Sequence, residues 1–239
     1  MLSSPKKKVA IIQSCYIPWK GYFDIINSVD TFILLDDVQY TRRDWRNRNQ
    51  IKTPQGIKWL SIPIDNKGKY SNQRILEVGV SDIQWATDHW NQIKVNYQHA
   101  PHFGKIAAWL EPLYKEAADE NSLSRINYLF ITKICEFLGI KTIVKWSTDY
   151  FPLADLNKFT AVERLFNLCK QEGATEYVSG PLAQDYFDKS LFEEHNINVS
   201  WFNYQNYAKY PQLHGEFTHN VSIIDMLMML GNTTSLDRK

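Results

Sequence analysis

Residues 9–49 read VAIIQSCYIPWKGYFDIINSVDTFILLDDVQYTRRDWRNRN, and this stretch decides the fold that the sequence predicts. Two short apolar runs, 9–12 and 31–35, are typical of buried strands, and the segment between them has helical spacing. The first run ends at Gln13 and the second at a pair of aspartates. Ligands of open α/β sheets lie outside the carboxyl ends of the strands. We therefore expect the first strand–helix–strand unit of such a sheet, with a site over its carboxyl edge.

The rest of the chain alternates between strand and helix patterns, which is typical of a mostly parallel sheet. The clearest helix is 122–138, whose apolar residues recur at intervals of three and four. The predicted fold class is α/β, with a doubly wound, mostly parallel sheet of about five strands and a β-hairpin and helical insertion after the second strand. The other predicted elements are strands at 142–146, 176–178 and 199–202 and helices at 160–170 and 223–230.

No long linker rich in Pro, Gly or Ser divides the chain, so we expect a single α/β domain over 1–239. An insertion or cap is expected at about 57–120. Within it, 57–64 and 74–80 alternate between apolar and polar residues and are predicted as strands, and helical patterns follow them.

Composition excludes several classes of protein. The 239 residues carry a formal net charge of +1, so no overall positive field attracts nucleic acid or an anionic membrane. No run approaches the roughly 18 consecutive apolar residues of a membrane span, and we expect no signal peptide. Cys15, Cys135 and Cys169 are widely spaced and follow no zinc or disulfide pattern, which favours a cytoplasmic protein.

The turn at 13–22 lies between a strand and a helix N-terminus, a place where free backbone N–H groups bind anions. Gly21 allows a backbone to approach a ligand closely, and Lys20 adds charge. The turn resembles that of the nucleotidylyltransferase and pantothenate-synthetase-like superfamily, where a His-x-Gly-His tetrad follows a proline. Trp19-Lys20-Gly21-Tyr22 stands in that place here, without either histidine. The alternative is a tight turn packed with aromatic side chains.

Asp36 and Asp37 end the second apolar run, at the predicted carboxyl edge. Paired carboxylates can hold a divalent cation together with phosphate oxygens. One of them, Asp37, is also a candidate general base for an amine nucleophile. The alternative is an ion pair between a carboxylate and an arginine of the following loop.

That loop places four arginines and a tryptophan within seven residues, 42–48. Arginine binds phosphate through two parallel hydrogen bonds, and tryptophan stacks on a base or a sugar face. We favour a phosphate-bearing small ligand because no second basic patch extends the track. An RNA-binding arm and a solvated charged loop are the alternatives.

Two later segments are predicted to reach the same sheet edge. A strand ends at Ser179-Gly180 and a helical turn begins at Pro181, which favours backbone and hydroxyl donors to a ligand. The aromatic segment 204–217 follows the last strand, and long ordered loops are usually functional. Its His214 is a candidate general acid or base, with a packing role as the alternative.

Six motifs are spread over nearly the whole chain. They are Gln13-x-x-Tyr16-x-Pro18-Trp19-x-Gly21-Tyr22-Phe23, Leu35-Asp36-Asp37-Val38-Gln39-Tyr40, Arg48-Asn49, Tyr177-x-Ser179-Gly180, Tyr210-x-Gln212 and Ser222-Ile223-Ile224-Asp225. By these motifs the sequence resembles the WbqC-like protein family. Members of that family are encoded in bacterial clusters for O-antigen and other surface polysaccharides. The resemblance implies transfer of glycine or another acyl group to an amino sugar.

The expected reaction is amide formation on the amino group of a nucleotide-linked amino sugar, with Asp37 or His214 as the base. Pantothenate-synthetase-like proteins activate a carboxyl group as an acyl adenylate, so the resemblance suggests ATP with magnesium. The acyl donor stays open between an amino acid, a carrier and an aminoacyl-tRNA. Two alternatives are a non-catalytic nucleotide-sugar-binding protein of an assembly complex and a transferase that uses aminoacyl-tRNA.

No metal ligands are predicted. The residues expected to bind substrate are Gln13, Tyr16, Trp19, Lys20, Gly21, Asp36, Tyr40, Arg42, Arg43, Trp45, Arg46, Arg48, Asn49, Ser179, Gly180, Tyr186, Tyr210 and Gln212.

Overall fold

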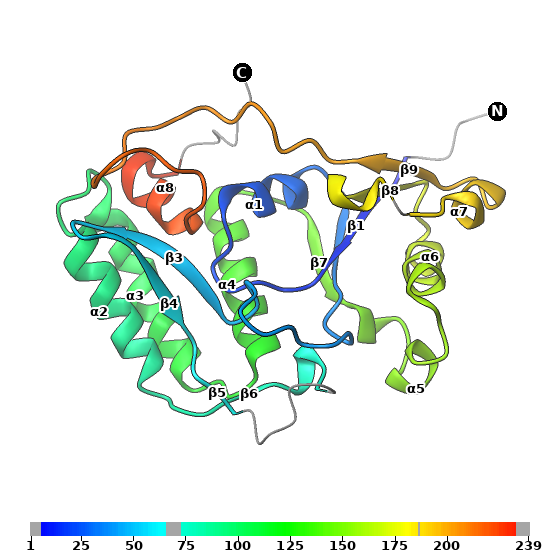
Figure 1. Cartoon of the computed structure of the whole chain (residues 1–239), viewed down its shortest axis with the longest axis horizontal. Coiled ribbons are helices and arrows are strands. Elements are labelled where there is room, and N and C mark those ends of the chain that lie inside the picture. The colour runs from blue at the N-terminus through cyan, green and yellow to red at the C-terminus, as the bar shows by residue number, and fades with distance from the viewer. Residues whose placement is uncertain (1–5, 66–72, 186, 233–239) are drawn as a thin grey trace. The chain divides into compact units, whose positions relative to one another are not determined.

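The structure is a computed structural model that describes residues 6–65, 73–185 and 187–232 (Figure 1). The chain forms two compact units, each assembled from separate segments. Unit 1 contains the described residues of 1–13, 24–37 and 140–205. Unit 2 contains those of 14–23, 38–139 and 206–239, and thus includes the range predicted as an insertion.

Unit 1 is organised around a five-stranded sheet in which every strand is parallel to its neighbours, which confirms the predicted α/β fold with a mostly parallel sheet of about five strands. The strand order reverses between β1 and β8, which makes this the topological switch point of the sheet. All four residues of β2 are buried, as expected for a parallel strand covered on both faces. In spatial order the strands are β7 (Ile143–Trp146), β2 (Thr31–Leu34), β1 (Lys8–Ile12), β8 (Glu176–Ser179) and β9 (Asn198–Trp201).

The helices of unit 1 pack their apolar faces against this sheet. Helix α6 (Ala161–Glu172) contacts β1, and α7 (Ser190–Glu194) contacts β9 (Figure 1). Thr160 caps α6 by accepting a hydrogen bond from the Glu163 backbone, and Gly173 ends the helix in the left-handed conformation, with φ of 72°. A short α5 (Leu153–Leu156) precedes α6, and α1 (Lys20–Asn27) begins in unit 2 and ends in unit 1.

In its described residues, unit 2 combines an antiparallel hairpin with four complete helices. Helices α2 and α3 lie side by side, and β3 contacts both α2 and α8 (Figure 1). Gly139 ends α4 at φ 73°, which agrees with the helix predicted over 122–138. Within the described residues, every helix is too short or too polar to cross a bilayer. The elements are β3 (Arg48–Thr53), β4 (Gly56–Ser61), β5 (Ile64–Asp65), β6 (Gly79–Val80), α2 (Trp85–Tyr97), α3 (Phe103–Ala118), α4 (Leu123–Leu138) and α8 (Ile223–Leu230).

One predicted strand is mostly wrong. Of residues 74–80 only Gly79–Val80 form a strand, while Ile75–Glu77 form a 3-10 turn. The Glu77 carboxylate reaches back to the Arg74 backbone N–H at 2.9 Å and to its guanidinium at 2.8 Å. This local capping pair stabilises the turn against an extended strand.

Candidate functional site

The carboxyl edge of the sheet in unit 1 collects several of the predicted residues. Gln13 directly follows β1, and Ser179 is the last residue of β8. These strands are neighbours at the switch point, so Gln13, Ser179 and Gly180 occupy the place where open α/β sheets bind ligands. Tyr186 lies outside the described residues.

The aspartate pair after β2 is buried at the same edge, with Asp36 1% and Asp37 4% exposed. The Ser147 hydroxyl, which follows β7, donates to Asp37 Oδ1 at 2.5 Å. Arg164 of α6 lies with Nη1 3.2 Å from Asp37 Oδ2. The arginine that pairs with Asp37 therefore comes from α6 rather than from the loop that follows the carboxylates. This ion pair supplies the positive charge that a buried carboxylate needs.

Unit 2 contains a cavity of about 250 Å³, which we call the aromatic cavity. Its walls are the rings of Trp19, Tyr22 and Trp45, and its polar lining comes from two asparagines and a thiol. Ring walls with a few amide groups are typical of small-molecule sites. The lining residues are Cys15, Pro18, Trp19, Tyr22, Trp45, Asn49 and Asn220, of which the sequence predicts Trp19, Trp45 and Asn49.

The position of the Trp19 ring in the cavity wall explains why residue 21 is a glycine. A Cβ atom at position 21 would lie 2.3 Å from ring carbon Cζ2 of Trp19, which is far inside van der Waals contact. The indole of Trp19 also meets Tyr207 edge-on, with 5.6 Å between ring centres. Gly21 therefore allows the indole to lie flat over the turn.

Lys20, next to this wall, is buried and turned toward aromatic faces. Its Nζ donates to the Ala208 carbonyl at 3.1 Å and lies 4.9 Å from the ring centre of Tyr207 and 5.2 Å from that of Tyr210. Such contacts stabilise a buried ammonium through the ring quadrupole. Lys20 thereby anchors the segment 207–210 within unit 2.

The backbone that Asn49 contacts, in the wall of the aromatic cavity, is strained. Ile17 has φ of 35°, which a β-branched residue rarely adopts. The side-chain amide of Asn49 donates to the carbonyls of Tyr16 at 3.0 Å and Ile17 at 3.1 Å, which holds this conformation. Strain of this kind concentrates at binding and active sites.

Cys15 lines the cavity beside a guanidinium. Arg46 Nη1 donates to Cys15 Sγ at 3.0 Å and to the Ser14 carbonyl at 3.1 Å. Asn127 of α4 donates to the Ser14 hydroxyl and to the Arg46 carbonyl, both at 2.9 Å. Arg46 is therefore turned inward and supports the turn, rather than lying with the exposed arginines of its loop.

The other loop residues point outward or hold the loop. Arg42 and Arg43 are exposed, and the guanidinium of Arg48 lies 4.1 Å from the ring centre of Trp59. The Tyr40 hydroxyl donates to Asn47 Oδ1 at 2.9 Å and ties the two ends of the loop together.

Tyr16 is enclosed in the core of unit 2. Its hydroxyl lies 2.9 Å from His89 Nδ1 and 2.8 Å from the Tyr114 hydroxyl. Burial raises the pKa of Tyr16 well above its usual range and lowers that of His89 to about 4. At neutral pH these groups form an uncharged, buried hydrogen-bond network.

Tyr210 and Gln212 converge on the buried carboxylate of Asp225. Tyr97, Tyr210 and the Gln212 side-chain amide each donate to it at 2.8 Å. Burial raises the pKa of Asp225, and the hydrogen bonds from Tyr210, Tyr97 and Gln212 act against that rise. Lys52 Nζ donates to Gln212 Oε1 at 3.1 Å and extends the network.

His214 follows in the same segment, and its Nε2 lies 2.9 Å from the Asn96 carbonyl. A carbonyl only accepts, so the His214 ring donates to it through Nε2.

Comparison with known proteins identifies the family. The model of the WbqC-like protein family matches residues 13–236. The chain belongs to the WbqC-like protein family. It is 50% identical over 225 residues to the uncharacterized protein Rv1507c of Mycobacterium tuberculosis (strain ATCC 25618 / H37Rv), a match that covers 94% of each chain. No solved structure gives a significant match.

The residues of the family motifs lie at different places in the structure. Trp19 and Tyr22 line the aromatic cavity, whereas Tyr210, Gln212 and Asp225 form the buried network. Ser222 caps α8, because its hydroxyl accepts from the Ile224 backbone at 3.2 Å.

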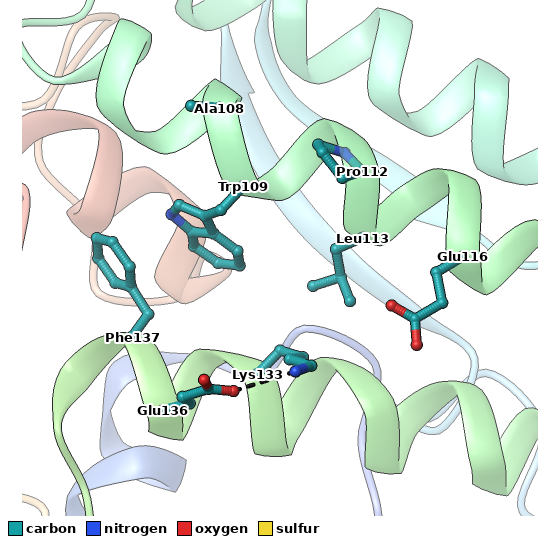
Figure 2. A pocket seen from close by; sticks show the side chains of 8 residues that line it. All are labelled: Ala108, Trp109, Pro112, Leu113, Glu116, Lys133, Glu136 and Phe137. Carbon is teal, nitrogen blue, oxygen red and sulfur yellow. Dashed lines mark hydrogen bonds and ion pairs between the residues drawn. The ribbon is translucent and has the colours of Figure 1, made fainter.

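A second, larger hollow of about 470 Å³ lies between α3 and α4 (Figure 2). Trp109 of α3 stacks on Phe137 of α4, with 4.8 Å between ring centres. Lys133 and Glu136 form an ion pair at 3.1 Å on its α4 side (Figure 2). None of the predicted site residues lines this hollow, so the aromatic cavity is the better candidate in unit 2.

Proposed function

We propose that this protein transfers an acyl group, glycyl being the smallest aminoacyl case, to the amino group of a nucleotide-linked amino sugar in surface-polysaccharide (O-antigen) biosynthesis. The observation that carries the proposal is the aromatic cavity. Trp19, Tyr22 and Trp45 offer ring faces for stacking, and Asn49 and Asn220 offer amides for hydroxyl groups.

The volume of the cavity supports a ring-sized occupant. Sites for drug-sized ligands occupy roughly 300–1,000 Å³. At about 250 Å³ the aromatic cavity is below that range, so it accommodates a single sugar ring but not a complete nucleotide sugar. The sugar, which carries the reacting nitrogen, is therefore the part assigned to the cavity.

The chemistry requires a base and an activated carboxyl group. The sugar ammonium loses a proton to the base, and its nitrogen attacks the acyl carbonyl. The bond from the carbonyl to the leaving group then breaks, and the leaving group takes the bonding electron pair and the second proton that the nitrogen loses. His214 is suited to the first step because its protonated Nε2 faces the Asn96 carbonyl and leaves Nδ1 to accept. Asp37, which pairs with Arg164, remains the second candidate.

The proposed reaction also needs a place for the acyl donor. No cluster of three potential metal ligands among His, Cys, Asp and Glu is found in the described residues. Magnesium commonly needs only one or two carboxylates and is otherwise held by substrate phosphates. If ATP is used, Asp36 is the candidate carboxylate for magnesium, and the ATP phosphates would supply most of the ligands.

The test is product formation. Purified protein is incubated with a UDP- or dTDP-linked amino sugar and, in parallel, with glycine and ATP, glycyl-coenzyme A or glycyl-tRNA. We expect a new mass corresponding to the amide with one donor, and its loss with Trp19→Ala. Trp109→Ala, a matched indole deletion between α3 and α4, should retain activity. No amide with any donor would overturn the proposed reaction.

A non-catalytic nucleotide-sugar-binding protein is the second candidate. The turn at 19–22 favours this candidate. Trp19 and Tyr22, two walls of the aromatic cavity, stand at the positions where the His-x-Gly-His tetrad has its histidines. Binding of the nucleotide sugar without amide product, with every donor tested, would support this candidate instead.

A further inference from the structure

One face of the β3–β4 hairpin, together with Trp45 of the loop before β3, carries a group of aromatic and basic side chains. Trp45 is 40% and Trp59 39% exposed, and their ring centres lie 5.2 Å apart with 36° between the planes. The guanidinium of Arg48 covers Trp59 at 4.1 Å. We call Trp45, Trp59 and Arg48 the tryptophan platform. Adjacent exposed indoles are unusual, because large aromatic side chains are normally buried, and they mark binding surfaces.

The strand register explains why the platform faces outward. Gln50 pairs with Trp59 and Arg48 pairs with Ser61, so Arg48 and Trp59 are diagonal neighbours on one face. The opposite face presents Ile51 and Leu60, both of which are buried. The platform therefore lies on the outer face of a strand pair whose inner face belongs to the core of unit 2.

The loop at the edge of the platform is fixed by its own hydrogen bonds. Arg48 Nη2 donates to the Arg43 carbonyl, and the Trp45 backbone N–H donates to Asp44 Oδ1 at 2.7 Å. Arg43 adopts φ of 59°, and its side chain is exposed. The platform is thus held in place before any ligand arrives, which lowers the entropy cost of binding.

We propose that the tryptophan platform binds the nucleoside-diphosphate part of the substrate, an assignment that rests on the proposed function. An indole face stacks on a base, and the guanidinium groups of Arg43 and Arg48 match the negative charge of a diphosphate. Trp45 belongs both to the platform and to the lining of the aromatic cavity. The sugar in the cavity and the nucleotide on the platform are therefore adjacent across one indole.

The same chemistry would suit single-stranded RNA, but the extent of the platform favours one nucleotide. Successive bases of a strand need successive stacking rings. The platform offers one pair of indoles, and the chain has a net charge of only +1. A single base with its two phosphates uses all three platform residues.

The test is calorimetric titration of the full chain with UDP, dTDP, GDP and ADP, each without sugar. We expect at least one to bind, and Trp59→Ala to weaken that binding by about 5- to 140-fold, the range for loss of one base–aromatic stack. Arg48→Gln should weaken the diphosphate more than the corresponding nucleoside. Ile57→Ala, on the same strand and 47% exposed, is the matched control and should bind like the unmodified protein.

Several outcomes would overturn this assignment. They are no binding of any nucleoside diphosphate, equal affinity in Trp59→Ala, binding of RNA oligonucleotides but not of mononucleotides, or a dimer that Trp59→Ala converts to monomer. Failure of the proposed function is separable. If nucleotide binding depends on Trp59 but no amide forms, the platform assignment stands and the proposed reaction fails. If amide forms and Trp59→Ala has an unchanged KM, the platform assignment fails and the proposed reaction stands.

Discussion

Replacement of Glu172 by glutamine should remove a large part of the stability of unit 1, and the loss should depend on pH. Glu172, at the end of α6, is 8% exposed. Its carboxylate lies 2.6 Å from Lys7 Nζ and 3.0 Å from Lys145 Nζ. It also accepts from the Thr31 hydroxyl at 2.8 Å and from the Tyr150 hydroxyl. These contacts tie α6 to β2, to β7 and to the residue before β1.

The magnitude follows from the pKa of this carboxyl. Burial alone would raise it, but the hydrogen bonds from Lys7, Tyr150, Lys145 and Thr31 outweigh burial and lower the pKa from 4.5 to about 2. A decrease of that size corresponds to ~3 kcal/mol in favour of the ionised folded state. The stability is fully present above pH 4.5, the value in the unfolded chain, and is lost as pH falls toward 2. At pH 3 only ~1.4 kcal/mol of it should remain.

The assay is urea unfolding of the native chain and of Glu172→Gln, followed by circular dichroism between pH 3 and pH 7. The difference in free energy of unfolding should be about 3 kcal/mol at pH 7 and should fall to roughly half that at pH 3. Glu136→Gln is the control, because Glu136 forms an exposed pair with Lys133 and should cost less than about 1 kcal/mol. A difference that does not change with pH, or a control that costs as much, would refute the reasoning.

Three further predictions concern unit 2. Gly21→Ala should displace the Trp19 indole, because the new Cβ would lie 2.3 Å from it. Calorimetry should then show binding of an amino sugar weakened at least tenfold, while the far-UV circular dichroism spectrum stays unchanged. Asp225→Asn should cost ~1–3 kcal/mol in urea unfolding, because one carboxylate oxygen becomes a donor facing the Tyr97 hydroxyl; equal stability would contradict this. Iodoacetamide should label Cys15 before the other two cysteines, as read by peptide mass spectrometry, and an amino sugar should slow that labelling. The contrast arises because burial raises the pKa of the other thiols, that of Cys135 to about 12.

The sequence predicts the sheet well because its signals are local. The short apolar runs are buried strands, and the glycines at 139 and 173 end helices in the left-handed conformation that favours glycine. The all-parallel, five-stranded sheet follows from strands that alternate with helices. Its carboxyl edge carries Gln13 and Ser179, where the apolar runs end.

The hairpin strand β3 was not predicted from the sequence, because its residues lack a periodic apolar face. Arg48, Asn49, Gln50 and Lys52 are polar, yet Asn49 and Lys52 are buried. Each has partners that are distant in sequence. Asn49 bonds to the strained turn at Ile17, and Lys52 bonds to Gln212. A strand that is stabilised by long-range polar contacts has no signature in hydrophobic periodicity.

The candidate site was only partly predictable for the same reason. Cys15, Asn220 and Trp59 carry no motif, and the first two join the aromatic cavity only through the folding of unit 2. The arginine cluster is one run in the sequence but divides in space. Arg46 turns inward to Cys15, whereas Arg48 turns outward onto Trp59. Spacing along the chain cannot separate these two directions in an irregular loop.

The turn at Trp19-Lys20-Gly21-Tyr22 contributes two aromatic walls and no histidine to the candidate site. The indole of Trp19 lies over Gly21, and both Trp19 and Tyr22 line the aromatic cavity. Ring walls at these two positions supply stacking surface, so the turn is suited to holding a ring. Acyl transfer to an amine requires positioning of the nitrogen and one base, and positioning alone can contribute several kcal/mol to the barrier. Aromatic walls at Trp19 and Tyr22 are therefore consistent with the proposed reaction, for which His214 and Asp37 are the candidate bases.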